Sequence, residues 1–493
     1  MIRNRKVYLS LNLVQNQQKL LIVLLAILLG LLVGFLVAKP KFTLLNLSLS
    51  GGVFLIFLWF LQYKDIAIFS IEKIFCYLVF FTGFFGVALF LIDIGPFTLF
   101  PYRIFLLFLW FIFGLHTLVK GKIVFSQSKI KWFIVLLFIW LGYALISSAW
   151  SISKEDAIKN IIFLFMGVSL IFFSTHYFRK KKELQILYNL WLYIFGFLIV
   201  IGFWEHLTGY HLPISGFFGE TRTRFMFMPT GVFYNTNDYA TFLALSIPFG
   251  IGIIRYGHKK YLRFSGLLCI ISSFYLIVAA GSRANIIAVL FELTFILLFL
   301  LNFKRKIKSV IIIGVCAILL LIFLPGPVQE FFSQIGRELN SVVSQTEQMT
   351  GSVGVRMNLV RNGLLFLYST VGFGVGAGNS EYYMANFAHY NTAGILNPHN
   401  WWLEILINYG IFIFIGYVIF YIGIIRNLWK IYRKKQTRGE KMICEALLVS
   451  LVGFFFSSIS SSSIMAFNPQ WLLFAFALSY LNFFRNKEEK VCI

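Results

Sequence analysis

Four arginines and one histidine stand out because each lies in a polar segment of an otherwise apolar sequence. The arginines are Arg222, Arg224, Arg283 and Arg356, and a guanidinium group binds phosphate or carboxylate oxygens through paired N–H donors. His399 adds an imidazole, which can take up a proton near neutral pH. An anionic ligand would explain the arginines, and the alternative is that they are solvated or contact lipid headgroups.

Arg283 lies in a very short turn, Gly281-Ser282-Arg283-Ala284-Asn285, between two apolar segments. A cation at that depth is costly and tends to face a polar cavity, although its side chain could instead extend to the headgroups. Because the turn is so short, we favour a functional role for Arg283. Ser282 is expected to cap the helix that follows.

His399 lies in the segment Asn397-Pro398-His399-Asn400, which has the pattern of a helix start. Asn397 is a suitable N-cap and Pro398 suits the first helical position, so His399 is predicted to lie in the first turn. The positive end of the helix dipole disfavours a protonated imidazole there and favours a bound anion. A simple polar anchor at the membrane surface is the alternative role for His399.

Three further segments give weaker signals. Residues 231–240 supply Asn and Asp caps for a helix, and Asn237 could orient a sugar or phosphate next to Arg224. Residues 372–377 match the dinucleotide-binding fingerprint but lie outside any strand–helix pattern, so their glycines indicate a flexible or tightly packed turn. The serines of 457–463 are expected to allow close helix packing inside a span.

The elements that must position these residues are membrane spans. Of the 493 residues, 59% are hydrophobic and 13% are charged, whereas soluble domains have about 25% charged residues. This composition excludes a soluble enzyme, a disordered chain and a disulfide scaffold. The net charge is +24, but none of the basic regions lies next to a folded polar domain, which argues against nucleic acid as a partner. About fourteen apolar segments fit spans of about 20 residues, near 20–38, 44–63, 74–93, 99–118, 132–150, 158–176, 184–204, 238–254, 264–281, 284–302, 309–325, 401–425, 443–465 and 470–484.

The basic residues predict the orientation of these spans. With the N-terminus inside, 32 of the 43 Lys and Arg residues fall on inner segments and 11 on outer ones, which is a strong positive-inside bias. Both termini are therefore predicted to be cytoplasmic. The expected fold is an all-α polytopic membrane protein that forms one multi-pass domain over residues 1–493.

Two long outer loops follow from this topology, over residues 205–237 and 326–400. The second loop is too long to be structureless in a compact protein. Apolar residues at helical spacing over 328–349 predict an amphipathic helix on the outer membrane surface, and residues 355–368 can form another helix. All the candidate site residues lie on this outer side.

The order of the motifs along the chain is more specific than any one of them. Residues 231–240, the turn 281–284, Arg356 followed by the glycine-rich residues 372–379, and Pro398-His399-Asn400 occur in succession. This succession resembles the O-antigen ligase and polymerase superfamily of bacterial membrane glycosyltransferases, over about residues 220–425. The last motif most resembles the teichuronic acid polymerase branch of Gram-positive bacteria.

The resemblance implies an enzyme at the extracytoplasmic face of the bacterial plasma membrane. Its donors would be undecaprenyl-diphosphate-linked oligosaccharides, and no nucleotide sugar, cofactor or essential metal is expected. Membrane lipid is the second expected partner, and a flippase and chain-length proteins are candidate partners.

The resemblance also assigns roles to residues. His399 matches the catalytic position, where it would take a proton from the acceptor hydroxyl during an inverting glycosyl transfer. Binding of the diphosphate is implied for four arginines, with the choice between the two in the first outer loop left open: Arg283, Arg224, Arg222 and Arg356. Asn237 and Asn400 would orient the substrate, and Thr236 stands where the family usually has proline.

The resulting prediction is the polymerisation of lipid-linked repeats into a cell-wall or surface polysaccharide similar to teichuronic acid. One alternative is a ligase that moves a finished polysaccharide from lipid diphosphate to a final acceptor. A lipid-linked oligosaccharide flippase is the rival from a different class, and a non-catalytic scaffold for wall assembly is a third. A transporter would place its key polar residues near the bilayer midplane, whereas here they gather at the outer surface.

Overall fold

The computed structural model describes residues 71–94, 97–120, 130–301, 352–459, 461 and 464–492, and this part of the chain is almost entirely helical. One antiparallel pair of short strands, β1 (Ile92–Ile94) and β2 (Phe97–Leu99), joins the first two helices. The α-helices are α3 (Ile71–Gly83), α4 (Pro101–Lys120), α5 (Lys131–Ser147), α6 (Lys154–Tyr177), α7 (Lys181–Thr208), α8 (Thr223–Met226), α9 (Thr236–Tyr256), α10 (Lys260–Ala279), α11 (Arg283–Phe295), α14 (Ser352–Ser369), α15 (Ser380–Phe387), α16 (Trp401–Tyr432), α17 (Arg438–Ser457) and α18 (Asn468–Cys492). A π-helical turn, η2 (Ile296–Leu300), extends α11, and a 3₁₀ turn, η3 (Ile464–Ala466), precedes α18.

Seven of the described helices are long and apolar enough to cross a membrane: α4, α6, α7, α9, α10, α11 with η2, and α16. Each span predicted within the described residues overlaps a helix, but the one predicted over 74–93 is wrong in extent, because α3 ends at Gly83 and the chain continues as a turn and β1. The spans predicted near 20–38, 44–63 and 309–325 and the amphipathic helix predicted over 328–349 lie outside the described residues. The protein is a helix-rich, multi-pass membrane protein, and the total of fourteen spans stays a prediction.

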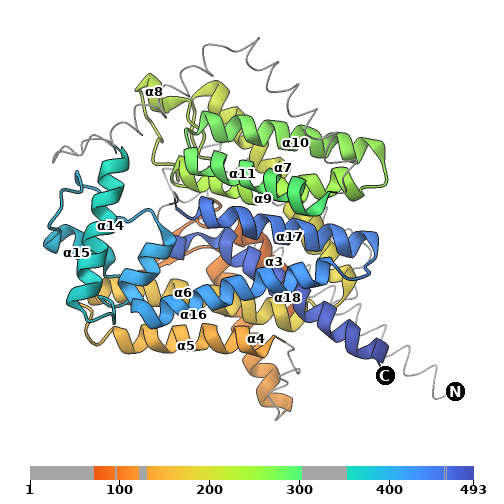
Figure 1. Cartoon of the computed structure of the whole chain (residues 1–493), viewed down its shortest axis with the longest axis horizontal. Helices are drawn as coiled ribbons and strands as arrows, with labels where there is room; N and C mark the ends of the chain where they lie inside the picture. The colour runs from red at the N-terminus through yellow and green to blue at the C-terminus, as the bar shows by residue number, and fades with distance from the viewer. Residues whose placement is uncertain are drawn as a thin grey trace.

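The long helices run side by side across the molecule, with α14 and α15 at one end and the C-terminus at the other (Figure 1). Helix α9 packs against α17 and α10, α6 packs against α18, and α11 packs against α17. We call the end with α14, α15 and the first residues of α9, α11 and α16 the site end. The other end, with the loops 257–259 and 433–437, is called the basic end.

Several outer helices present large apolar side chains to their surroundings, as a lipid-facing surface requires. Phe111 of α4, Trp132 of α5 and Ile271 of α10 are each more than half exposed. The centre of the bundle is instead filled by closely packed aromatic rings such as Trp191 and Phe249, which stack with centroids 4.6 Å apart. This arrangement is that of a helix bundle in lipid.

Two local predictions about elements are corrected by the structure. The all-α expectation is right except for β1 and β2, where two three-residue runs separated by Gly95 and Pro96 in the sequence pair as a hairpin. The serine run was expected inside a span, but α17 ends at Ser457. Ser458 hydroxyl donates to the carbonyl of Phe455 (3.0 Å), which competes with the helical pattern and helps to end the helix.

A buried ion pair closes the basic end. The carboxylate of Glu445 accepts hydrogen bonds from Arg255 Nη1 (2.5 Å), from the hydroxyl of Tyr256 (2.7 Å) and from the hydroxyl of Tyr432 (3.0 Å). Arg255 also donates to the carbonyl of Leu300 (3.1 Å). Because these residues come from α9, α16, α17 and η2, the cluster ties four elements together away from the site.

Helix α16 is broken at Gly410, whose φ of 73° and ψ of −176° are not helical. The carbonyls that lose their helical partners are taken up by a neighbouring turn. The amides of Val375 and Gly376 donate to the carbonyls of Ile407 (2.8 Å) and Asn408 (3.0 Å). The first nine residues of α16, which follow His399, are therefore fixed by this turn as well as by the helix.

Candidate functional site

The start of α16 differs from the prediction. Asn400, and not Asn397, is the N-cap, because its side-chain Oδ1 accepts from the amides of Trp402 (3.1 Å) and Leu403 (3.3 Å). His399 lies before this cap with a φ of 48°, in the left-handed region. The amide of His399 donates to Asn397 Oδ1 (2.8 Å), so Asn397 closes the preceding turn instead of opening the helix. The expectation that His399 lies in the first helical turn was wrong.

The imidazole of His399 is half-buried, and its Nδ1 has no hydrogen-bond partner among the described residues. Burial lowers the pKa of His399, and the positive charge of Arg356 lowers it further. The neutral ring is therefore favoured, and one of its nitrogens can accept a proton. Arg356 and His399, which come from separate motifs, are close enough for one charge to act on the other.

Helix α14 carries Arg356 on an exposed position and holds the following loop with two buried asparagines. Asn362 Oδ1 accepts from the amide of His389 (3.0 Å). Asn358 Nδ2 donates to the carbonyl of Asn391 (2.9 Å). Helix α14, which contains the residues 355–368 predicted as helical and extends beyond them at both ends, thus positions the segment that leads to His399.

The turn before α11 is bonded to the start of α9. Ser282 hydroxyl donates to Asn237 Oδ1 (2.7 Å), and Asn285 Nδ2 donates to Ser282 Oγ (2.8 Å). Ser282 occupies the N-cap position of α11 but makes no capping hydrogen bond with its side chain, which corrects the expectation that it caps the helix. Arg283, the first residue of α11, is exposed. Asn237 therefore lies next to the turn that carries Arg283. Gly281 supplies the positive φ of 68° that this turn needs.

The link between α17 and α18 joins these helix starts to the segment with His399. Ser458 accepts the amide of Trp401 at its carbonyl (2.9 Å) and the indole Nε1–H of Trp402 at its hydroxyl (3.0 Å). Ser461 hydroxyl donates to the carboxylate of Asp238 in the first turn of α9. The serine run, expected to serve helix packing, thus ties α9 and α16 together.

Helices α9, α11 and α16 consequently begin close to one another at the site end (Figure 1). The helix dipole gives each N-terminus a partial positive charge, which attracts anions, although the first amides of α16 are already bonded to Asn400 and Ser458. Arg283 adds a full positive charge at the first residue of α11 and Arg356 adds another on α14. The electrostatics of this end suit a phosphate-containing ligand.

The first long loop is fixed by a buried carboxylate. Glu205, at the end of α7, accepts from the amides of Thr230 (2.8 Å) and Gly231 (2.6 Å). His211 Nδ1 lies 3.5 Å from Glu205 Oε1, and its Nε2 is 2.8 Å from the carbonyl oxygen of Met226. Burial by itself lowers the pKa of His211, but the hydrogen bond and charge of Glu205, with the carbonyl of Met226, raise it overall.

The two arginines of this loop lie at the short helix α8. Arg222 is its N-cap residue, and its guanidinium donates from Nε (2.9 Å) and Nη2 (2.6 Å) to the two carboxylate oxygens of Glu220. The backbone of Arg224 is part of α8. Glu220 therefore neutralises Arg222, so an anion would meet less positive charge there.

The glycine-rich residues 372–378 form a tightly packed turn, as one of the two interpretations predicted. A Cβ added to Gly374 would lie 2.5 Å from the amide nitrogen of Gly410, and one added to Gly376 would overlap Ser151 Oγ. Asn379 Oδ1 accepts from the amide of Ser153 (2.8 Å), which holds the turn to the start of α6. The turn is occupied by protein backbone and side chains rather than shaped to hold a nucleotide.

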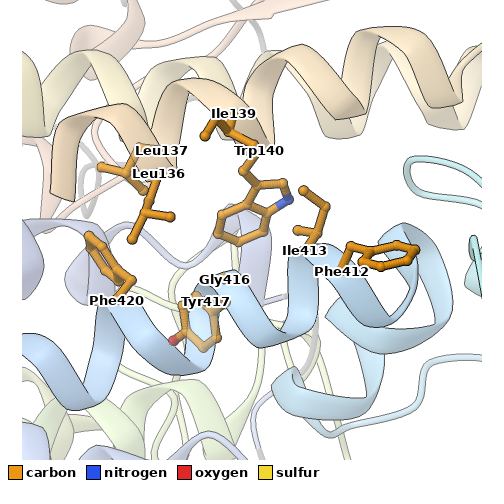
Figure 2. A pocket seen from close by; sticks show the side chains of 9 residues that line it. All are labelled: Leu136, Leu137, Ile139, Trp140, Phe412, Ile413, Gly416, Tyr417 and Phe420. Atoms are coloured by element: carbon orange, nitrogen blue, oxygen red, sulfur yellow. The ribbon is translucent and has the colours of Figure 1, made fainter. Parts of the chain in front are cut away.

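An apolar cavity of about 110 Å³ lies between α5 and α16, close to the site (Figure 2). Trp140, which lines it, contacts the ring of Trp401 at a centroid distance of 6.0 Å. Exposed Ile139 and Phe412 lie among its lining residues. A lining of this kind suits a hydrocarbon chain and not a sugar. The lining residues are Leu136, Leu137, Ile139, Trp140, Phe412, Ile413, Gly416, Tyr417 and Phe420.

Sequence reasoning missed the polar residues that hold the site in place. Asn358 and Asn362 are four residues apart and therefore share a helix face, which is a signal that the sequence contains. Ser458 was assigned to helix packing, and Glu205 bonds to backbone groups 25 residues away, for which no spacing rule exists.

Comparison with known proteins confirms the family that the motifs resemble. The O-antigen ligase family model matches residues 267–418, which include Arg283, Arg356 and His399. The teichuronic acid biosynthesis protein TuaE of Bacillus subtilis (strain 168) is 31% identical over 407 residues, which cover 82% of this chain and 82% of TuaE.

Proposed function

The chain belongs to the O-antigen ligase family and is a surface-polysaccharide ligase or polymerase; we propose that it polymerises undecaprenyl-diphosphate-linked oligosaccharide repeats. The product would be a cell-wall or surface polysaccharide of the teichuronic acid type, in line with the name of the relative in Bacillus subtilis. The observation that carries the proposal is the meeting of a neutral His399, a charged Arg356 and three helix N-termini at one end of the bundle.

We place this site end at the extracytoplasmic face of the plasma membrane. The basic end contains Lys259 in one loop, Lys260 at the start of α10, and the run from Arg433 to Lys435 in the other loop. Positively charged loops stay preferentially in the cytoplasm, so the opposite end would face outward. Lipid-linked donors would then present their diphosphate beside Arg283 and His399.

In the proposed reaction the diphosphate is the leaving group. The oxygen of an acceptor sugar hydroxyl attacks the anomeric carbon of the donor, and the bond from that carbon to the phosphate oxygen breaks. The electron pair leaves with the diphosphate, and the hydroxyl proton passes to a ring nitrogen of His399. One displacement inverts the anomeric configuration, and repetition extends the polymer.

Arg283 and Arg356 would bind the diphosphate and stabilise the negative charge that develops on it. Arg224 is our preferred third arginine, because Arg222 is paired with Glu220. Asn237 accepts a hydrogen bond from Ser282 and would hold the turn that carries Arg283 against the start of α9. Asn400 would act through the cap that fixes the backbone after His399.

The decisive experiment is the reconstitution of the purified protein in vesicles that contain lipid-linked repeats on the outer leaflet. Polymer formation without lipid transport, and without added metal or nucleotide sugar, supports the polymerase. We expect His399→Ala and Arg283→Ala to abolish elongation while the protein still inserts, and Arg283→Lys to remain poor because an ammonium cannot form the planar two-point contact. His389→Ala is the matched control, since His389 is exposed and its backbone, not its ring, bonds to Asn362.

The same experiment separates the other functions. Normal-length polymer from the His399→Ala variant would contradict its role as base. Transfer of finished chains to a non-lipid acceptor without elongation would identify a ligase, and lipid translocation without any new glycosidic bond would identify a flippase.

A further inference from the structure

Glu292 is an acidic side chain in the middle of a membrane-spanning helix. It follows Arg283 by nine residues in α11, which corresponds to roughly 13 Å along the helix axis. Its side chain is fully buried, and neither carboxylate oxygen has a hydrogen-bond partner within the part of the chain that the structure describes. Glu205 and Glu445, which are also buried, each accept several hydrogen bonds.

Helix α17 provides the space for this carboxyl group at a glycine. A Cβ added to Gly453 would overlap Glu292 Oε1 and would lie 2.6 Å from Glu292 Cγ. The adjacent ring of Phe291 packs on Phe456 with centroids 4.8 Å apart. The carboxyl group is therefore enclosed in the contact between α11 and α17.

Charged neighbours do not compensate for this burial. No described charged group acts on the Glu292 carboxyl. The charged residues of the helices packed against α11 lie toward helix ends, and they are Asp238 and Arg255 on α9, Lys260 and Arg263 on α10, and Arg438, Glu440, Lys441 and Glu445 on α17. An isolated carboxylate in apolar surroundings is far more costly than the neutral acid, so such a group holds its proton.

A cluster of polar side chains lies between the level of Glu292 and the site end, on the same face of α11. Asn285 precedes Glu292 by seven residues, so both lie on the same face of α11 about two turns apart. Asn285 Nδ2 donates to Thr241 Oγ1 (3.2 Å) and to Ser282 Oγ (2.8 Å), and Ser282 bonds to Asn237. A proton on Glu292 would thus lie below the turn that carries Arg283.

We propose that Glu292 is a proton-binding site inside the membrane-spanning bundle and a site of modification by apolar carbodiimides. The neutral acid allows α11 to lie directly on Gly453 of α17, which a carboxylate would not. This inference does not depend on the polymerase function, because its main readout is chemical.

The reaction with a carbodiimide reports the proton directly. The acid proton passes to one carbodiimide nitrogen, and the carboxylate oxygen bonds to the central carbon to give an O-acylisourea. Migration of the acyl group from oxygen to nitrogen then leaves a stable N-acylurea, and no atom is lost. A carboxylate at the surface can take that proton from water, whereas a carboxyl group enclosed in the bundle must already hold it. An apolar reagent reaches the bundle interior through lipid, and a water-soluble reagent does not.

The test uses the full chain in proteoliposomes treated with dicyclohexylcarbodiimide and analysed by peptide mass spectrometry. We expect one adduct on the peptide with Glu292 in the wild type and none there in Glu292→Gln, which resembles the neutral acid and should be purified in equal yield. Glu155 is the internal control for a water-soluble carbodiimide, because its side chain is 69% exposed. That reagent should modify Glu155 and not Glu292.

Two outcomes would overturn the inference. One is the absence of the dicyclohexylcarbodiimide adduct on Glu292 in folded protein. The other is modification of Glu292 by the water-soluble reagent, which would mean that water reaches the carboxyl. As a further comparison, Glu292→Lys should yield far less folded protein than Glu292→Gln, and equal yields would contradict the enclosed, neutral site.

Discussion

The protonation of His399 depends on its burial and on the charge of one neighbour. Its ring is half-buried and lies close enough to Arg356 for the guanidinium to lower its pKa below 6.5 in addition to the effect of burial. A general base works only in its unprotonated form. A lowered pKa therefore extends activity toward lower pH, and the same arginine that would bind the diphosphate also keeps the base neutral.

The first prediction concerns the pH profile of the reaction. We expect the rate to rise with pH through the lowered pKa of His399 and then to level off. Arg356→Gln removes the positive charge, so the pKa of His399 should move up and the rising limb of the profile should shift to higher pH. The measurement is the initial rate of polymer formation from pH 5 to 8, and Arg361→Gln on the same helix, whose guanidinium lies over the ring of Tyr390, is the control. An unshifted limb in Arg356→Gln would contradict the coupling.

At the scale of elements, the first long loop is held by Glu205 and His211 rather than by regular structure. The protonated form of His211 is favoured in the folded protein, because Glu205 raises its pKa despite burial. The stabilisation is therefore complete at pH values below the unfolded pKa of about 6.5. It is lost as the pH rises through the raised pKa of the folded state.

The second prediction follows from this loss of stability at higher pH. Cleavage of residues 211–230 by a protease should be slow in mildly acidic buffer. It should be faster at alkaline pH, because His211 loses its proton and the contact between Glu205 and His211 weakens. His211→Gln should remove this pH dependence, and Glu205→Ala should expose the loop at all pH values, since it also removes the two backbone hydrogen bonds, at a cost of about 2 kcal/mol. His206→Gln serves as the comparison, because His206 bonds to Tyr275 and the carbonyl of Phe227 rather than to a carboxylate. A wild-type cleavage rate that did not change with pH would contradict the titration of His211 beside Glu205.

The cavity between α5 and α16 gives a third prediction. Gly416 lines it and has open space around the position of a Cβ. Gly416→Leu should narrow the cavity and raise the KM for a long-chain isoprenoid donor, with a smaller effect on a donor with a short chain. Gly142→Leu is the matched control, because Gly142 also has open space in α5 but does not line the cavity. Equal effects of the two variants on KM would argue against a hydrocarbon chain in this cavity.

The sequence predicted most helices but only part of the geometry of the site. An apolar run of about 20 residues predicts a membrane-spanning helix even where single residues favour another structure. This is why the sequence predicted α9 and α16. The start of α16 was misplaced because Asn397 and Asn400 are both good caps, and the choice between them depends on which one closes the turn at His399.

The features of the site that the sequence did not predict are mostly contacts between residues that are far apart along the chain. Ser458 and Trp401 are far apart in sequence and meet through a backbone hydrogen bond, which leaves no residue pattern. Arg356 and His399 were selected separately by their chemistry and their motifs, but their electrostatic contact depends on how the loop between them is held by Asn362. The roles of the candidate residues remain predictions, whereas the structure describes where the backbone of each one lies in the fold.

At the scale of the whole molecule, the two ends of the bundle differ in kind. The basic end is closed by ion pairs such as Lys487 with Glu440 (2.8 Å). The site end instead combines helix N-termini, arginines and buried asparagines. Such polarity is what a membrane enzyme needs if one end anchors in the cytoplasmic leaflet and the other handles an anionic substrate.

The fourth prediction tests this orientation. Tyr368→Cys, at a position of α14 that is 86% exposed, should react with a membrane-impermeant maleimide added to intact cells. Lys259→Cys, at an exposed position of the basic end, should react only after the cells are opened. The reverse pattern would put the site in the cytosol and would end the proposed use of outer-leaflet donors.

The break at Gly410 reverses a familiar rule of protein engineering. Replacing a helical glycine by alanine usually adds stability, by up to about 1 kcal/mol. Here the residue has a positive φ, and a methyl group would meet the carbonyl of Gly372, which accepts from the amide of Ile411 (2.9 Å). A designer who straightened α16 in this way would therefore break the contact between this helix and the glycine-rich turn. The first nine residues of α16, which follow the proposed base His399, would then be less well fixed.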